Sequence, residues 1–209
     1  MHIEKFNYND SDDLISNTYV VDDGKSCFVV DPGADNDSII NYIEKHSFSL
    51  EAVLLTHGHV DHIRGVDRLI NKYGCKLYVH HLDDVMLKDP CVNCSINFGK
   101  LIVVKTNPTF IEDGDILNIL DDCKIRVIHT PYHTKGSVCY LLNNNILFTG
   151  DTLFRLSIGR DDLPNASPTS KEESFNKIKK LPSETKIYPG HGQNSVLSEE
   201  LALNRFLYY

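Results

Sequence analysis

Short apolar runs recur in both halves of the chain, and their length and spacing predict β-strands. In the first half they cover residues 3–8, 17–21, 27–30, 50–55 and 76–79. In the second half they cover residues 116–120, 124–128, 137–142, 146–148 and 186–188. Polar turn formers such as Asp22-Asp23-Gly24-Lys25 separate neighbouring runs, as a hairpin requires. The pattern therefore predicts many short strands divided between two halves.

Apolar residues three or four positions apart predict helices over residues 39–46, 63–73, 82–87, 170–180 and 198–206. Residues 89–107 show only a weak pattern, and we find neither an internal repeat nor a linker. We therefore expect a single domain over residues 1–209. Two sheets that pack face to face with helices outside would satisfy this pattern, which predicts a mixed α/β (α+β) fold.

Composition narrows the class of partner. The net charge of −8 argues against nucleic acid or an anionic membrane as the main partner. The N-terminus has no basic head followed by an apolar stretch, and the six cysteines are scattered. We therefore expect a cytoplasmic protein with reduced thiols. Cys91 and Cys94 form a lone C-x-x-C without further zinc ligands at fitting spacing, and we interpret them as unpaired thiols.

The densest chemistry lies directly after the apolar run 50–55, in Thr56-His57-Gly58-His59-Val60-Asp61-His62. Imidazole and carboxylate groups suit zinc, iron or manganese. His57 and His59 are two positions apart, so they cannot share a helix face, but a loop relaxed by Gly58 lets them converge on one ion. Asp61 and His62 are then free to turn toward a second ion. A polar loop with incidental histidines is the alternative interpretation, and this density of ligands argues against it.

Further residues of the same kind follow other predicted strands. The full set of ligand-type residues at strand ends is His57, His59, Asp61, His62, His133, Asp151 and His191. Seven ligands exceed the three or four that one ion needs, whereas two neighbouring ions with a bridging carboxylate would use about that number. The sequence therefore predicts a binuclear metal site.

These residues resemble the motif of the metallo-β-lactamase superfamily, a strand followed by T-H-x-H-x-D-H, then a lone His, a lone Asp and a final His. The resemblance covers nearly the whole chain. The segments Phe148–Phe154 and Tyr188–Gly192, and Ser157–Arg160 with Asp162-Leu163-Pro164, are similar to the glyoxalase II-like branch, the hydroxyacylglutathione hydrolases.

The resemblance implies a four-layer αββα sandwich with the site at one edge between the sheets. It implies one metal held by His57, His59 and His133, a second held by Asp61, His62 and His191, and Asp151 as the bridge. We expect two divalent ions, with zinc first and iron or manganese as alternatives. The groups expected to carry catalysis are His57, His59, Asp61, which would also orient the nucleophile, and Asp151.

Other residues bear on the substrate. Arg160 is a candidate contact for a substrate carboxylate, and a structural ion pair is the alternative. Tyr132 and Arg64 stand where the family usually has glycine, so we expect both to protrude near the pocket and restrict substrate size. Asp31 is a candidate to fix a metal-binding imidazole from behind, and a plain Asp-Pro-Gly turn is the alternative.

The predicted activity is hydrolysis of a small-molecule thioester, such as S-lactoylglutathione, or of a related ester. Two cations that share a water lower its pKa toward roughly 7, so a nucleophile forms at neutral pH. The chain ends 18 residues after His191 and lacks most of the C-terminal helical part that supplies glutathione contacts in full-length glyoxalase II. The alternatives are a mononuclear iron persulfide dioxygenase with the same ligands, and a non-catalytic binding protein.

Overall fold

The computed structural model describes residues 1–7 and 16–208, so the last position of the predicted strand 3–8 lies outside it. Most of the strands form two six-stranded sheets. In order across the first sheet, the strands are β1 (His2–Asn7), β2 (Asn17–Asp22), β3 (Ser26–Val30), β4 (Ser49–Leu54), β5 (Lys76–His80) and β6 (Thr109–Ile111). In order across the second, they are β14 (Ser195–Val196), β13 (Lys186–Pro189), β10 (Ile146–Gly150), β9 (Val138–Leu142), β8 (Ile125–His129) and β7 (Ile116–Leu117). A small ribbon adds β11 (Leu153–Phe154) and β12 (Ser157–Ile158).

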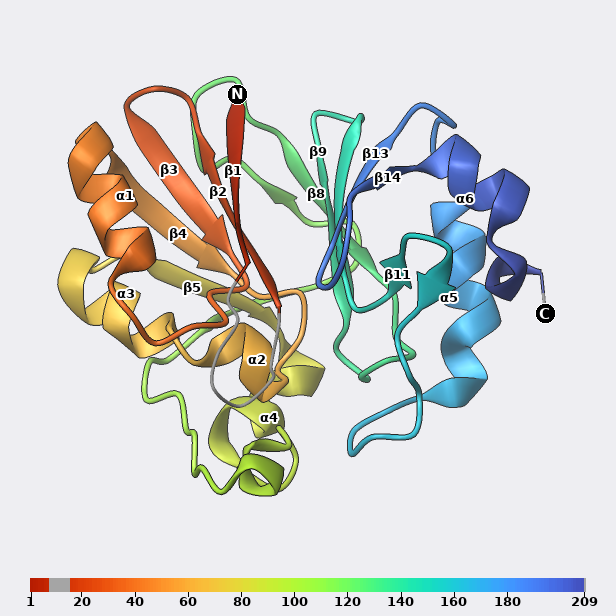
Figure 1. Ribbon diagram of the computed structural model, residues 1–209, viewed down its shortest axis with the longest axis horizontal. Helices are drawn as coiled ribbons and strands as arrows, with labels where there is room; N and C mark the ends of the chain where they lie inside the picture. The colour runs from red at the N-terminus through yellow and green to blue at the C-terminus, as the bar shows by residue number, and fades with distance from the viewer. Residues whose placement is uncertain (8–15, 209) are drawn as a thin grey trace.

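Helices cover the outer face of each sheet (Figure 1). α1 (Ser38–His46) and α3 (Val66–Tyr73) cover the first sheet, and α5 (Lys171–Ile178) and α6 (Leu197–Leu203) cover the second. The order of layers is therefore helix, sheet, sheet, helix, as predicted, and the fold is the αββα sandwich.

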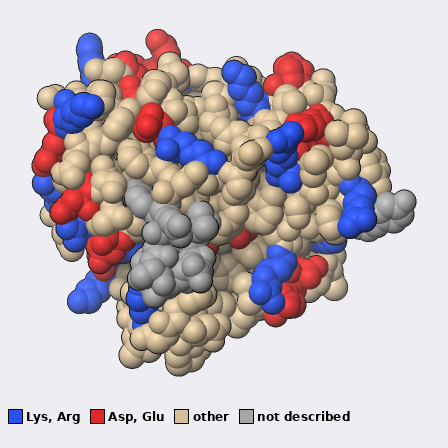
Figure 2. All heavy atoms as spheres, in the orientation of Figure 1, with Lys and Arg blue, Asp and Glu red and all other residues tan. Residues whose placement is uncertain are grey.

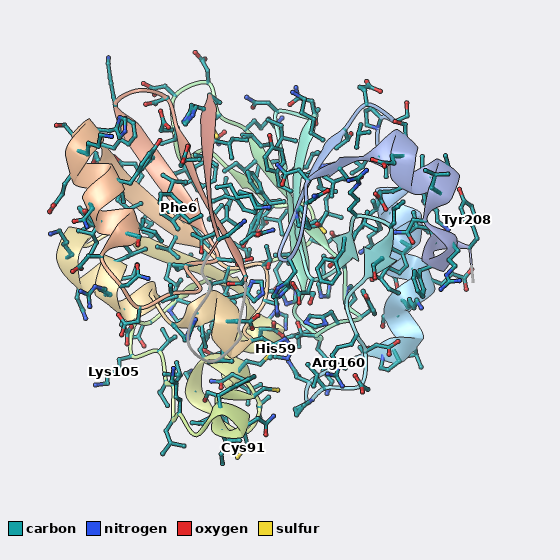
Figure 3. The ribbon with its side chains drawn as sticks, in the orientation of Figure 1. Phe6, His59, Cys91, Lys105, Arg160 and Tyr208 are labelled. Carbon is teal, nitrogen blue, oxygen red and sulfur yellow. The ribbon has the colours of Figure 1, made fainter. Side chains whose placement is uncertain are left out.

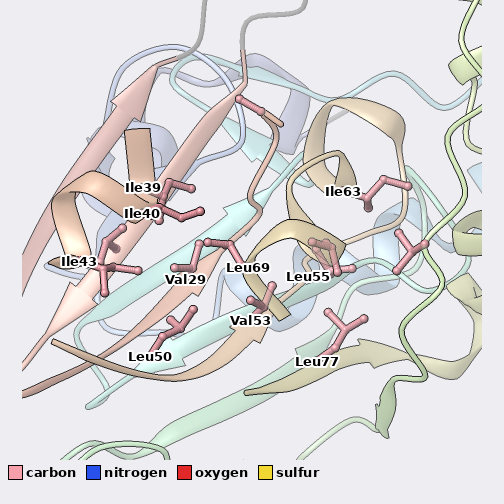
Figure 4. Close-up of a cluster of buried hydrophobic side chains, with 14 of the residues drawn as sticks. Val29, Ile39, Ile40, Ile43, Leu50, Val53, Leu55, Ile63, Leu69 and Leu77 are labelled. Atoms are coloured by element: carbon pink, nitrogen blue, oxygen red, sulfur yellow. The ribbon is translucent and has the colours of Figure 1, made fainter. Parts of the chain in front are cut away.

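Alternation along the central strands builds this sandwich because successive side chains point to opposite faces of a sheet. In β4, Val53 joins the cluster under α1 and α3, whereas Ala52 and Leu54 join the cluster between the sheets. Figure 4 shows the first of these clusters, in which Ile39 and Ile43 of α1 lie over the sheet. Residues 52–54 of β4 are thus buried on both faces, which explains why this part of the strand reads as a continuous apolar run.

The predicted helix 63–73 is wrong as a single element. The chain forms a short α2 (Val60–Ile63), breaks at Arg64 and Gly65, and begins again as α3. Gly65 donates its N–H to the carbonyl of Pro32, and a Cβ there would lie 2.5 Å from the carbonyl oxygen of Ala34. This close approach to the loop after β3 changes the direction of the chain between the two helices. The periodicity of apolar residues does not reveal such a contact.

The last predicted helix is also shorter than expected. α6 ends at Leu203, and Arg205–Leu207 forms a separate 3₁₀ turn, η4. The side chain of Asn204 causes the change because it accepts a hydrogen bond from Phe206 N at 3.1 Å.

The weakly patterned stretch 89–107 holds a 3₁₀ turn, η2 (Ser95–Phe98), anchored by Asn93. The buried side chain of Asn93 donates to the carbonyls of Met86 and Ile102 and accepts from Ser95 N. None of the helices in the described part of the chain is long and apolar enough to cross a bilayer.

The two sheets are tied together next to the histidine-rich loop. The buried hydroxyl of Tyr140 on β9 donates to the carbonyl of Leu55 at 2.7 Å, and Val138 N donates to Thr56 O at 2.9 Å. These bonds fix the end of β4 against the second sheet.

Replacing Tyr140 with Phe should lower the free energy of unfolding by about 1–3 kcal/mol, because the buried Leu55 carbonyl loses its side-chain partner. Urea denaturation measures the change. Tyr42→Phe is the control, since the Tyr42 hydroxyl is partly exposed and makes only a 3.5 Å contact to His2. Equal effects of the two substitutions would contradict the role given to the Tyr140 hydrogen bond.

Candidate metal centre

The loop after β4 brings the first two histidines together. Gly58 is required between them because a Cβ there would lie 2.5 Å from Met86 Cβ. The rings of His57 and His59 lie close together on either side of this glycine, with centroids 4.9 Å apart and both side chains buried.

His133 reaches the same point from the loop after β8. Its Nε2 lies 2.9 Å from His59 Nδ1, and its ring centroid lies 4.8 Å from that of His57. The three side chains place nitrogen atoms close enough to bind one ion, and we refer to them as the three-histidine group. Burial lowers the pKa of His57 well below its usual value and that of His59 to about 3, so both rings are neutral, as metal ligation requires.

A second group lies beside the first. The α2 residues Asp61 and His62 meet His191, which follows β13. Asp61 Oδ2 lies 3.2 Å from His191 Nε2 and 3.6 Å from His62 Nε2. One carboxylate and two imidazoles are again suitable ligands for a divalent transition metal.

Asp151 lies between the two groups, at the end of β10. One of its carboxylate oxygens is 3.4 Å from His62 Nε2, and the other is 3.5 Å from His133 Nε2 and 3.4 Å from His191 Nε2. The structure thus gathers all seven predicted ligands, with Asp151 in contact with both groups.

The site contains buried polar atoms that lack a hydrogen-bond partner among the described residues: His57 Nε2, His59 Nε2, His62 Nε2 and Asp151 Oδ1. Leaving such atoms unpaired costs free energy, so each is expected to have a partner. The donor set fits metal cations, which would satisfy these atoms together.

Hydrogen bonds to the Nδ1 atoms of His133 and His62 orient these two rings. His133 Nδ1 donates to the Arg160 carbonyl at 2.6 Å, which leaves the Nε2 lone pair free to face the site. The buried carboxylate of Asp31 lies 3.0 Å from His62 Nδ1 and accepts from Thr56 N and Thr56 Oγ1. Asp31 therefore does more than form a turn, and the hypothesis that it supports an imidazole is confirmed.

Residues 11–191 match the family described as the metallo-beta-lactamase superfamily. This chain belongs to that superfamily.

Similar proteins share the fold over nearly the whole chain. A protein of Haemophilus influenzae named hydroxyacylglutathione hydrolase GloC is 30% identical, covering 89% of this chain and 89% of its own. The crystal structure of BLEG-1 B3 metallo-beta-lactamase is 32% identical with a TM-score of 0.91, covering 100% of both chains. The crystal structure of TTHA1623 in a di-iron-bound form is 31% identical with a TM-score of 0.82, covering 93% of this chain and 96% of its own.

A cleft of about 330 Å³ opens over the candidate ligands. Its lining includes the candidate ligands His59, Asp61, His133, Asp151 and His191 and the side walls Val60, Cys94, Asn97, Phe98, Phe154, Gly159, Arg160 and Leu163. Figure 3 labels His59 and Arg160 next to each other at this part of the molecule. The walls are mostly apolar. Phe154 ends the motif segment 148–154, whereas sequence patterns did not single out Phe98 because it stands in no recognisable motif.

Arg160 lies at the cleft as expected, where its exposed guanidinium pairs with Asp162 through contacts of 2.6 and 2.8 Å. Cys94 is a buried thiol at the same cleft and Cys91 is exposed, and all six cysteines are free thiols, as interpreted from the sequence. On the face shown in Figure 2, acidic and basic side chains are interspersed.

Tyr132 and Arg64 do not protrude into the cleft, so the expectation that they narrow it is wrong. The Tyr132 ring is fully buried against Phe175, with centroids 5.4 Å apart, and its hydroxyl donates to the Gly159 carbonyl. Arg64 is turned toward the loop after β3, where its Nε donates to the Gly33 carbonyl at 2.6 Å. Both large side chains fill space between elements.

Tyr132→Gly should lower the free energy of unfolding by about 3–5 kcal/mol because it leaves a cavity under α5. Tyr132→Phe keeps the ring and should cost much less. Neither should change the ratio of kcat/KM between bulky and small substrates, since the buried ring does not line the cleft. Chemical denaturation and substrate comparison on both variants measure these effects. A stable Tyr132→Gly protein with broadened substrate range would restore the original expectation.

Protons compete with metal in the second group. Burial lowers the pKa of His191, but the carboxylates of Asp151 and Asp61 outweigh it and raise that pKa to about 10. Burial likewise opposes the protonation of His62, and Asp61, Asp151 and Asp31 together raise its pKa well above the usual value. In the metal-free protein at neutral pH, the imidazolium forms thus neutralise the carboxylates.

Metal uptake by the metal-free protein should therefore release protons, and the apparent affinity should be weaker at pH 6 than at pH 8. Titration calorimetry with Zn²⁺ in two buffers of different ionisation enthalpy measures the number of protons released. Binding that neither releases protons nor strengthens with pH would show that these histidines are already neutral.

Proposed function

We propose that this protein is a binuclear metal-dependent thioester hydrolase of glyoxalase II-like type. The observation that carries the proposal is the position of Asp151, within 3.5 Å of ligand nitrogens in both groups. A single carboxylate placed in this way is suited to bridge two cations. The relative named as a hydroxyacylglutathione hydrolase and the structural neighbour with two bound irons support the same reading.

The residues of the site have distinct roles in this proposal. His57, His59 and His133 would hold one divalent ion, and Asp61, His62 and His191 a second, with Asp151 between them. Such a pair, when bound, supplies a water of lowered pKa and polarises a carbonyl oxygen. Asp61 lines the cleft, where its carboxylate would accept a hydrogen bond from the attacking water and orient it toward the substrate. A thiolate leaves without a dedicated general acid.

The cleft also indicates what the substrate looks like. Val60, Phe98, Phe154 and Leu163 offer apolar walls, and Arg160 is the one Lys or Arg among the described residues that line it. Arg160 can exchange its exposed partner Asp162 for a substrate carboxylate at small cost, because a surface ion pair contributes little. A glutathione carrier, which is charged at several points, therefore finds few complementary groups.

Thioesters should be hydrolysed with weak discrimination between carriers. S-lactoylglutathione should be cleaved with kcat/KM below about 10⁴ M⁻¹s⁻¹, and thioesters of shorter thiols at similar efficiency.

Asp151→Ala should bind both ions more weakly and lose several orders of magnitude in turnover, while circular dichroism should show that the apo-protein stays folded. The measurements are turnover and metal content, with two transition-metal ions expected per chain.

The same assay separates the alternatives. A strong preference for the glutathione ester would indicate a dedicated glyoxalase II. Oxygen uptake with a persulfide, together with saturation at one iron, would support the dioxygenase. A β-lactam belongs in the panel because of the likeness to BLEG-1, and its cleavage without thioesterase activity would contradict the proposal.

A further inference from the structure

Asp83 is a buried carboxylate with no place among the predicted ligands. It ends η1 (His81–Asp83), directly before α4 (Asp84–Lys88), and its side chain is 0% exposed. A carboxylate is rarely so deeply buried unless it is paired, so each of its contacts calls for a physical explanation.

Four donors surround this carboxylate. One oxygen accepts from Gly136 N at 2.8 Å and Asn165 Nδ2 at 2.8 Å. The other accepts from Gly58 N at 3.0 Å and Thr134 Oγ1 at 2.7 Å. Burial raises the pKa of Asp83 to about 6, and these four donors oppose that rise.

The position of the donors in the chain is the informative feature. Gly58 stands between His57 and His59, in the loop that follows β4 of the first sheet. Thr134 and Gly136 follow His133 in the loop after β8 of the second sheet. Asn165 lies beyond Arg160, whose carbonyl accepts the hydrogen bond from His133. Asp83 thus joins the loops that carry all three members of the three-histidine group, although it touches none of the rings.

The surroundings leave little freedom for these loops to shift. A Cβ at Gly136 would lie 2.6 Å from Asp83 Oδ1, and a Cβ at Gly58 would lie 2.5 Å from Met86 Cβ in α4. The absence of a side chain at both positions lets each backbone N–H approach the carboxylate. The loops are therefore held at a separation that the Asp83 side chain sets.

We propose that Asp83 is a positioning residue that fixes His57 and His59 relative to His133 and so determines the metal affinity of the three-histidine group. The inference rests on the metal centre proposed above and extends it beyond the ligands. Groups that orient metal ligands from outside typically change metal affinity 10–100-fold when they are lost. The group of Asp61, His62 and His191 has no described hydrogen bond to Asp83, so its affinity should change much less.

The test compares metal affinities of full-length wild type and Asp83→Asn, which keeps the size but replaces one acceptor oxygen with a donor. Zn²⁺ competition against a chromophoric chelator gives the two dissociation constants, and the Co²⁺ absorption spectrum reports ligand geometry. His133→Ala and His191→Ala serve as references that assign each constant to its group. We expect a 10–100-fold weaker three-histidine group, an altered Co²⁺ spectrum for it, and a change below about threefold at the other.

Glu200 in α6 offers a matched control. Its carboxylate is also 0% exposed and accepts from Leu156 N at 2.9 Å, Asn204 Nδ2 at 2.8 Å and Ser195 Oγ, none of them adjacent in sequence to a metal ligand. Glu200→Gln should lower stability and leave both metal affinities unchanged. Thr134→Val removes a single donor and should weaken the three-histidine group in the same direction by less, and Thr134→Ser should restore it.

The outcomes are separable. Asp83→Asn with both constants within twofold of wild type, or an equal loss at both groups, overturns the positioning role. An equal loss in Glu200→Gln overturns it as well. If Asp83→Asn does not fold, the Thr134 pair decides, and unchanged affinity in Thr134→Val contradicts the inference. A wild-type protein that binds no ion at the three-histidine group refutes the proposed function instead.

Discussion

The burial of unpaired ligand atoms is the constraint on which this structure depends. In the described part of the chain, buried atoms without a hydrogen-bond partner include Asp151 Oδ1 and the Nε2 atoms of His57, His59 and His62. Their desolvation opposes folding unless cations or protons satisfy them. The raised pKa of His191 and the lowered pKa of His59 show two outcomes of this constraint. The carboxylates outweigh burial at His191, whereas burial and the neighbouring His133 outweigh them at His59. In the metal-free protein, the raised pKa values of His62 and His191 thus favour their protonated forms, and the lowered pKa values of His57 and His59 favour their neutral forms.

The sandwich meets this constraint because the site lies at one edge, where loops of its two sheets meet. Candidate ligands follow β4 in one sheet and β8, β10 and β13 in the other, so neither sheet holds a complete group of its own. The hydrogen bonds from Tyr140 to Leu55 and from Val138 to Thr56 join the two sheets directly before His57. Stability of the interface and geometry of the metal groups are therefore linked.

The cleft walls come from segments with little regular structure. Asn93 anchors the stretch that carries Cys94 and Phe98, and its backbone carbonyl accepts from Val60 N at the start of α2. Asn93 thus positions an apolar wall through its side-chain amide and supports the helix of Asp61 and His62 through its backbone carbonyl. Loops that are held in this way on a rigid scaffold are where superfamilies vary their substrates.

Local pattern determined much of this protein. Alternating and continuous apolar runs predicted the central strands, because burial on one or both sheet faces is written directly in successive residues. The seven candidate ligands could be named from the sequence because they stand at strand ends and at fixed places in the motif. Three features had no such local signature: the break at Gly65, the burial of Tyr132 and the convergence of four donors on Asp83. Each depends on contacts between residues far apart in the chain, such as Gly65 with Pro32 and Asp83 with Gly136. Only the tertiary structure decides them, because the chain must fold before such distant groups become neighbours.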